Sequence, residues 1–74
     1  MKVKKHRRGV YIVTLHNHSF TIEGCSWSKS WAIYNANGTE VNRWTTKASL
    51  LDVMSRWSPE YTTTQAEQEF CTYA

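Results

Sequence analysis

The hydrophobic pattern of this chain changes its period once, near Thr45, and no other feature limits the fold as strongly. Across residues 10–44, apolar and aromatic side chains occur in short runs separated by polar turns, which is typical of antiparallel strands. Beyond Thr45, the apolar side chains recur at the spacing of one helix face: Leu50, Val53, Met54 and Trp57. The sequence therefore predicts an α+β domain in which a three- or four-stranded antiparallel sheet packs against one α-helix.

Two pairs of segments are the candidate strands. Residues 10–15 (VYIVTL) and 20–23 (FTIE) flank a polar link, so we expect them to form a hairpin. Residues 31–34 (WAIY) and 39–44 flank Asn37-Gly38, two residues that tolerate the positive φ of a tight hairpin turn. Alternation in the first hairpin predicts one shared face for five side chains: Tyr11, Val13, Leu15, Phe20 and Ile22.

The helix is expected to begin near Thr46, whose hydroxyl can cap its N-terminus, or about three residues later, where Ser49 and Asp52 form a second capping candidate, and to be stopped by Pro59. A helix of this length is marginal alone, so its apolar face must pack on the sheet. For residues 59–74 we weigh an irregular extension against a short helix capped by Thr64 and lined by Ala66, Phe70 and Tyr73. We therefore divide the chain into a basic leader (1–9), a sheet-plus-helix domain (10–58) and a C-terminal extension (59–74).

The net charge of +3 is unevenly distributed along the chain. Residues 1–22 contain five basic side chains and no acidic one, whereas residues 23–74 contain four basic and six acidic ones. A leader of this kind can neutralise nucleic-acid phosphates, or it can simply keep a neutral domain in solution. If it binds nucleic acid, the candidate contacts are Lys4, Lys5, Arg7 and Arg8.

Reactive groups are sparse in this sequence. His16-x-His18 would place two imidazoles on one face of a strand, but no C-x-x-C or H-x-x-x-H spacing supplies the remaining ligands of a tetrahedral metal site. Cys25 has Lys29 nearby in sequence, yet no orienting base accompanies it. We therefore expect a protein that is not an enzyme and has no catalytic residue, metal site or cofactor, with two solvated turn histidines.

Cysteine usage and hydropathy indicate the compartment. Cys25 and Cys71 are too few for a disulfide framework, and whether they pair is left open. No segment approaches the roughly 20 apolar residues of a membrane span. We expect a cytoplasmic protein that does not enter a membrane. Monomer and dimer both remain open, because the edge strand of so small a sheet can pair with a second copy.

Exposed aromatic side chains are the candidates for partner binding. Trp31 and Trp57 lie on the apolar faces of their segments and are expected in the core. Trp27 lies in a serine-rich loop, and Tyr34 and Trp44 fall on the face of the sheet opposite Trp31. With the neighbouring cations, the predicted partner-binding set is Trp27, Lys29, Tyr34, Arg43 and Trp44. The alternative assigns Trp27 and Trp44 to a second small core beneath the tail.

The order of strands and helix, with W-A-I-Y-x-x-x-G-x-x-V and then T-K-A-S-L-L-D-V-M-S-R-W, resembles the arm-binding domains of tyrosine integrases and the plant ethylene-response DNA-binding domain. This resemblance implies a three-stranded sheet in the major groove with a helix behind it. The chain lacks the dense basic decoration of those sheets, because after residue 8 its strands contain only Arg43.

In size and style the chain is also similar to small phage-encoded accessory proteins, including anti-CRISPR inhibitors. That resemblance implies a non-catalytic inhibitor or regulator that binds a host protein or nucleoprotein complex. We favour this function from the sequence, and the alternative is a nucleic-acid-binding module that uses the basic leader and the sheet.

Overall fold

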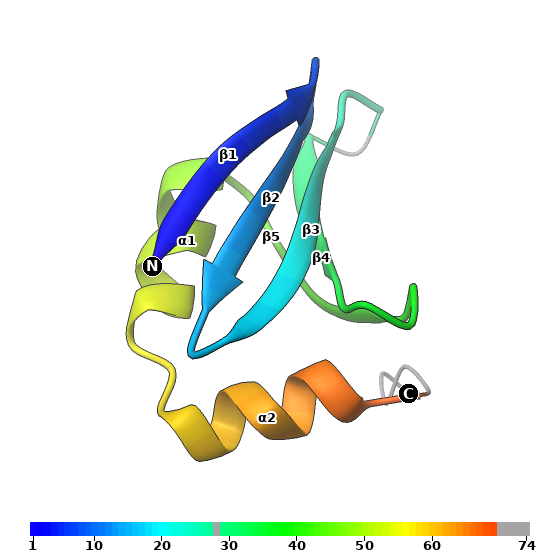
Figure 1. Cartoon of the computed structure of the whole chain (residues 1–74). Coiled ribbons are helices and arrows are strands. Elements are labelled where there is room, and N and C mark those ends of the chain that lie inside the picture. Colours follow the sequence, from blue (N-terminus) through cyan, green and yellow to red (C-terminus); the bar gives the residue numbers. More distant parts are fainter. Residues whose placement is uncertain (28, 70–74) are drawn as a thin grey trace.

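The computed structural model describes residues 1–27 and 29–69 (Figure 1). Five strands form one antiparallel sheet in chain order, and two helices follow. The elements are β1 (Lys2–Arg7), β2 (Val10–Leu15), β3 (His18–Cys25), β4 (Ser30–Tyr34), β5 (Glu40–Trp44), α1 (Lys47–Ser55) and α2 (Pro59–Glu67). The predicted α+β class and antiparallel sheet are confirmed.

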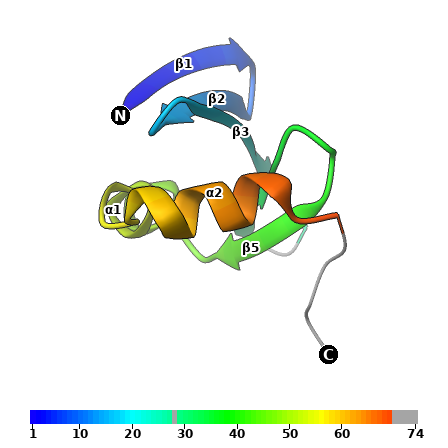
Figure 2. The same ribbon diagram turned by 60° about the horizontal axis from the view of Figure 1, so that its bottom comes forward.

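The sheet is strongly curled, so that its two edge strands face each other across the helices. Figure 2 shows β1 and β5 on opposite sides of the molecule with α1 and α2 between them. α1 packs against β5, and α2 packs against β3. The helices therefore fill the inside of the curl, and among residues 1–27 and 29–69 no helix lies over the outer face of the sheet.

The core lies between the inner face of the sheet and one side of α1. In the sheet, Val13 pairs with Phe20 and Ile22 pairs with Ile33, and all four side chains are buried. From α1, Leu50 and Met54 are both 0% exposed. The predicted shared face of the first hairpin is confirmed, because four of its five residues belong to this core and the fifth packs against it. The predicted burial of Trp57, directly after α1, is confirmed as well.

Tight turns fix the register of the hairpins. His16 and Asn17 have φ of 48° and 66°, as the mirror-image turn of a two-residue hairpin requires. Between β4 and β5, only Gly38 of the predicted Asn37-Gly38 pair adopts a positive φ, 80°. Its N–H donates to the carbonyl of Asn35 at 2.9 Å, which closes the turn.

The sheet has five strands, not the three or four predicted, because residues 2–7 of the basic leader form β1. All six side chains of β1 are exposed, and its backbone pairs with β2 from Lys2 opposite Thr14 to Arg7 opposite Val10. An edge strand that buries no side chain needs no apolar alternation. The strand therefore leaves no hydrophobic period in the sequence from which it could be predicted.

Of the two alternatives weighed for residues 59–74, the short helix is present as α2, but it begins at Pro59 and not near Thr64. Ser58 caps this helix, accepting a hydrogen bond from the Tyr61 N–H at 3.1 Å, and Pro59 occupies its first turn. Pro59 thus starts a helix and stops none, since α1 already ends at Ser55. The predicted cap of α1 is confirmed, with the Thr46 hydroxyl accepting from the Ser49 N–H at 3.1 Å.

Thr62, Thr63 and Thr64 lie inside α2, so Thr64 does not cap the helix as predicted. Each hydroxyl donates to the backbone carbonyl four residues earlier, at 2.8 to 3.1 Å. The expected helical contacts of Phe70 and Tyr73, and any pairing of Cys25 with Cys71, lie outside the described residues.

Candidate functional site

The β1–β2 turn, the β3–β4 loop and the link between β5 and α1 lie at one end of the sheet, the end that points upward in Figure 1. Gly24 of β3 pairs with Trp31 of β4, which in turn pairs with Trp44 of β5. The Gly24 N–H donates to the carbonyl of Gly9, in the β1–β2 turn, at 2.9 Å. We call this region the loop end and define it by Arg7, Arg8, Gly9, Ser26, Trp27, Lys29, Trp44 and Thr45.

Two hollows open at the loop end. The first, with a volume of about 400 Å³, is lined by Gly9, Gly24, Cys25, Ser26, Lys29, Ser30, Trp31 and Thr45. The second, of about 460 Å³, is lined by Ser30, Arg43, Trp44 and Thr45. Because Ser30 and Thr45 line both, the hollows adjoin each other. No carboxylate from the described part of the chain lines either one.

The indole of Trp31 forms one wall of the first hollow and lies against the backbone of Gly24. A Cβ atom at position 24 would come within 2.9 Å of that indole, so only glycine allows this contact. The Trp31 ring also packs on Tyr11, with 6.1 Å between ring centroids. The expectation of Trp31 in the core therefore holds in part, since the ring is half-buried and packs against the core while one side borders the hollow.

Cations surround this aromatic wall. The Lys47 ammonium lies 4.1 Å from the Tyr11 ring centroid and 6.0 Å from that of Trp31, close enough for cation–π attraction. Arg7, Arg8 and Lys29 are exposed at the same end. Within the described residues, ion pairs form only between Arg43 and Glu40 and between Arg56 and Asp52, so these three cations are not neutralised by a neighbouring carboxylate.

All four predicted nucleic-acid contacts lie on β1 and its turn. Lys4 pairs with Ile12 and Arg7 pairs with Val10, so both project from the outer face of the sheet. Lys5 pairs with Tyr11 and projects from the opposite face, and Arg8 forms part of the turn. A bulge between Lys5 and Arg7 returns Arg7 to the face of Lys4. The run of cations thus leads along the edge of the sheet to the loop end.

Three of the five predicted partner-binding residues gather at the loop end. Trp27 is 95% exposed, which confirms its expected position outside the main core and contradicts the alternative of a second core. Lys29 lines the first hollow, and Trp44, 39% exposed, lines the second. The expected face of Trp44 was wrong, because a bulge in β5 shifts the alternation and leaves Trp44 on the same side as Trp31.

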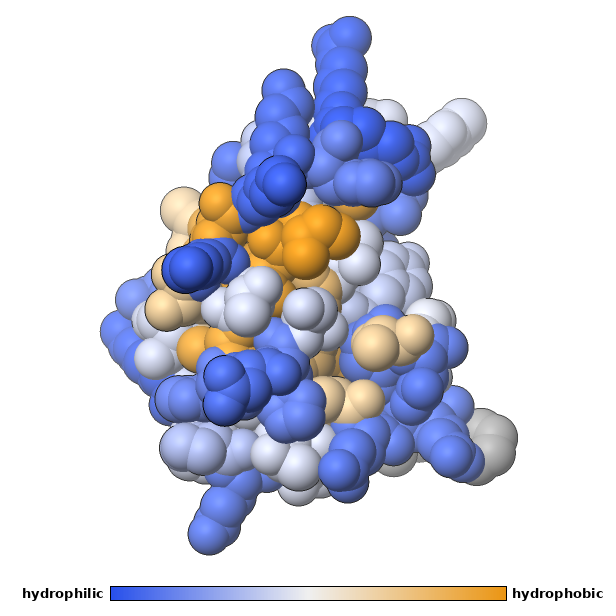
Figure 3. All heavy atoms as spheres, viewed as in Figure 1, coloured by the Kyte–Doolittle hydropathy of each residue, from blue (hydrophilic) through white to orange (hydrophobic). Residues whose placement is uncertain are grey.

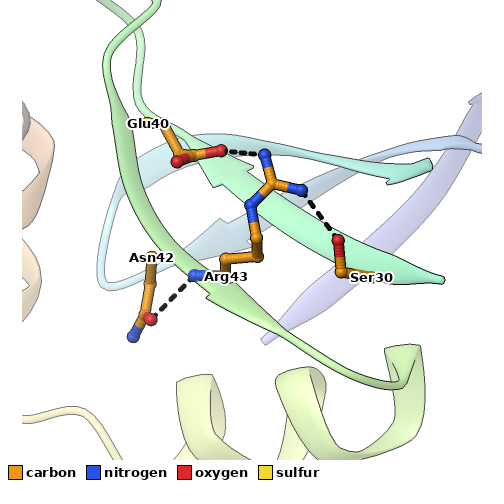
Figure 4. Close-up of polar contacts among 4 residues, drawn as sticks. All are labelled: Ser30, Glu40, Asn42 and Arg43. Atoms are coloured by element: carbon orange, nitrogen blue, oxygen red, sulfur yellow. Dashed lines mark hydrogen bonds and ion pairs between the residues drawn. The ribbon is translucent and has the colours of Figure 1, made fainter. Parts of the chain in front are cut away.

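Arg43 and Tyr34 lie on the outer face of the sheet, and Arg43 is held by its neighbours (Figure 4). Its guanidinium donates to the Ser30 hydroxyl at 2.7 Å and to the Glu40 carboxylate. That hydrogen bond to Glu40 raises the pKa of Arg43 above its ordinary value. Burial, and then the charges of Glu40 and Glu23, raise the pKa of Tyr34.

Of the two histidines that were expected to be solvated, His16 is exposed and His18 is half-buried, and each imidazole also makes a hydrogen bond. His16 Nε2 donates to the backbone carbonyl of Trp57 at 2.9 Å, and His18 Nε2 lies 3.3 Å from the Thr63 hydroxyl oxygen. Because that hydroxyl donates to the carbonyl of Pro59, it accepts from His18. Both imidazoles therefore attach the β2–β3 turn to the helical segment. Within residues 1–27 and 29–69, no three His, Cys, Asp or Glu side chains are grouped so that they could hold a metal ion.

Sequence reasoning missed the glycines and Lys47. An isolated glycine in a strand, such as Gly24, is a known signal of close approach by another group, so this part of the hollow could have been inferred. The position of Lys47 over Tyr11 depends on how α1 docks and has no signal in the local sequence.

In the described part of the chain, no helix is both long enough and apolar enough to cross a membrane. Comparison of the chain with protein-family models, with curated proteins and with solved structures finds no match.

Proposed function

We propose that this protein is a small non-catalytic module that binds nucleic acid through β1 and the loop end. The observation that carries the proposal is the ordering of the basic run, whose five cations form an exposed edge strand and turn: Lys2, Lys4, Lys5, Arg7 and Arg8. This strand leads to the end of the sheet where Lys29 and Trp27 are also exposed.

The spacing of these cations suits a phosphate backbone. Lys2, Lys4 and Arg7 pair with Thr14, Ile12 and Val10, which alternate along β2, so the three basic side chains share the outer face. Side chains on one face of a strand recur every ~7 Å, so they form a regular row of positive charge. Figure 3 shows hydrophilic side chains projecting upward from the loop end of the molecule.

The distribution of acidic residues supports an oriented approach of a polyanion. Half of the six acidic side chains of the chain lie on or just after α2: Glu60, Glu67 and Glu69. α2 packs beneath the sheet, at the end opposite the loop end (Figure 1). A molecule with this charge separation steers a polyanion toward β1 and away from α2.

The first test measures affinity for fluorescently labelled DNA and RNA by anisotropy at low salt. The variant R7Q/R8Q is compared with R56E, which changes the net charge by the same amount at the end of α1, outside the loop end, and thermal melts verify that both variants fold. We expect R7Q/R8Q to weaken binding by about tenfold or more and R56E to change it little, because the phosphate contacts lie at the β1–β2 turn. Absence of binding by the wild-type protein at low salt overturns the proposal.

The second candidate function, favoured from sequence, is inhibition of a host protein or nucleoprotein complex. The exposure of Trp27 favours it, because isolated tryptophans beside a hollow are typical anchors of protein interfaces. Its test is capture of a partner from nuclease-treated host lysate by wild-type protein and by Trp27→Ala. Capture that resists nuclease and is lost in Trp27→Ala supports this function, and capture that disappears with nuclease contradicts it.

A further inference from the structure

Binding of a phosphate backbone to β1 alone would not involve the first hollow at the loop end. Its volume of about 400 Å³ falls in the range of small-ligand sites, roughly 300 to 1,000 Å³. A flat heterocycle fits a space of this size, whereas a base pair held inside a duplex cannot enter it.

The walls of the hollow are suited to an aromatic ring. The Trp31 indole lies against the backbone of Gly24 and packs near Tyr11, with 6.1 Å between ring centroids, so its neighbours fix its position where it borders the hollow. Stacking of unpaired bases on such side chains is the common means by which proteins bind single strands. Trp27, in the β3–β4 loop that precedes Trp31, is exposed and can receive a neighbouring base.

The charge around the hollow is suited to the phosphate that every nucleotide carries. Lys29 lines the hollow, and Arg8 directly precedes Gly9, which lines it too. The hydroxyls of Ser26 and Thr45 offer hydrogen bonds to the edge of a base. A ligand that joins an aromatic ring to an anion is therefore complementary both to the Trp31 wall of the hollow and to the cations at its rim.

We propose that this hollow is a pocket for an unpaired base, so that the protein prefers single-stranded over double-stranded nucleic acid. The inference rests on the proposed function and adds the class of nucleic acid to it. In the complex, one base stacks on Trp31, and Lys29 and Arg8 hold the adjoining phosphates. β1 continues the contact along the backbone.

The experiment compares an oligothymidylate with its duplex of equal length, using the full chain and anisotropy at one salt concentration. Thr45→Trp places a large side chain at the rim of the hollow, and Ser55→Trp adds the same side chain to an exposed position on α1 as the control. Both substitutions are at exposed positions, so the core is left intact.

We expect the wild-type protein and Ser55→Trp to bind the single strand at least about tenfold more tightly than the duplex, since stacking on the protein is available only to unpaired bases. Thr45→Trp is expected to lose this preference and to bind both with the affinity of the duplex. Equal binding of single strand and duplex by the wild type overturns the pocket and leaves the proposed function standing, as does an unchanged preference in Thr45→Trp. Failure to bind either form overturns both proposals.

Discussion

Asn35 joins the β4–β5 turn to the end of α2 through both ends of its amide. The side chain is 4% exposed. Its Nδ2 donates to the carbonyls of Gln65 and Gln68 at 2.9 and 2.6 Å, and its Oδ1 accepts from the N–H groups of Asn37 and Thr39 at 3.0 and 3.1 Å. The last carbonyls of a helix have no partner within the helix, so this side chain supplies what α2 lacks.

Replacing Asn35 with alanine is expected to lower the free energy of unfolding by about 2–4 kcal/mol, because several part-buried backbone groups lose their partners together. Asn37→Ala is the control from the same turn, since its side chain makes one surface hydrogen bond of 3.4 Å, and we expect it to cost less than about 0.5 kcal/mol. Urea unfolding of both variants measures the difference. Equal losses would show that Asn35 does not hold α2.

Tyr34 gives the fold a weakness at high pH. Burial and the nearby carboxylates raise its pKa above the ordinary value of 10.0, so the folded state favours the neutral phenol. Below pH 10 both states are protonated and stability is unaffected, whereas above it the unfolded chain ionises first and stability falls until the folded-state pKa is passed. Tyr34→Phe is expected to lose less stability than the wild type between pH 9 and 11 in urea unfolding. An identical decline would contradict this expectation.

At the scale of elements, local sequence predicted β2 to β5 and α1 but neither β1 nor the start of α2. β1 buries no side chain, so its existence depends on backbone pairing with β2, which leaves no hydrophobic period in the sequence. In α2, three successive threonines disfavour a helix, and tertiary contacts through Thr62 and Ala66 override that preference. The signal that was available is Ser58-Pro59-Glu60, a helix cap followed by first-turn residues.

The candidate site was predicted only in part, because some of its features depend on strand pairing and not on local sequence. Exposure of Trp27 follows from its polar loop, and the sequence alone was enough to infer it. The side of Trp44 depends on the bulge between the pairs Ile33–Asn42 and Tyr34–Glu40, and strict alternation cannot anticipate an extra residue. The hollow itself forms from segments that are distant in sequence, so its lining became visible only once the register was known.

The docking of α1 sets how much stability the sheet gains from its inner face. Leu50→Ala is expected to lower the free energy of unfolding by about 2–5 kcal/mol, because the side chain is fully buried and its removal leaves a cavity. Leu51→Ala removes the same atoms from the adjacent, half-buried position and is expected to cost clearly less. Thermal or urea unfolding distinguishes the two. A larger loss at Leu51 would place the helix in a different rotation.

At the scale of the whole molecule, the two ends of the curled sheet differ in what covers them. α2 covers the end where the β2–β3 and β4–β5 turns lie, and His18 and Asn35 attach it there. Neither of the two described helices lies across the loop end, which carries cations, two partly or fully exposed tryptophans and two hollows. One end is therefore held by contacts with α2, and the other is the surface to which we assign binding in the proposed function.

This division of charge makes the salt dependence of binding a property of one end. Each phosphate contact with a single strand contributes a slope of about −0.7 to the plot of log affinity against log salt concentration. If β1 and its turn make about four such contacts, the wild-type slope is close to −3, and R7Q/R8Q is expected to flatten it by about 1.4. R56E has the same net charge as R7Q/R8Q, but its change lies outside the row of cations, so we expect it to keep the wild-type slope. Anisotropy titrations over a series of salt concentrations measure all three slopes. Equal flattening in both variants would mean that net charge alone, and not the ordered row on β1, governs the attraction.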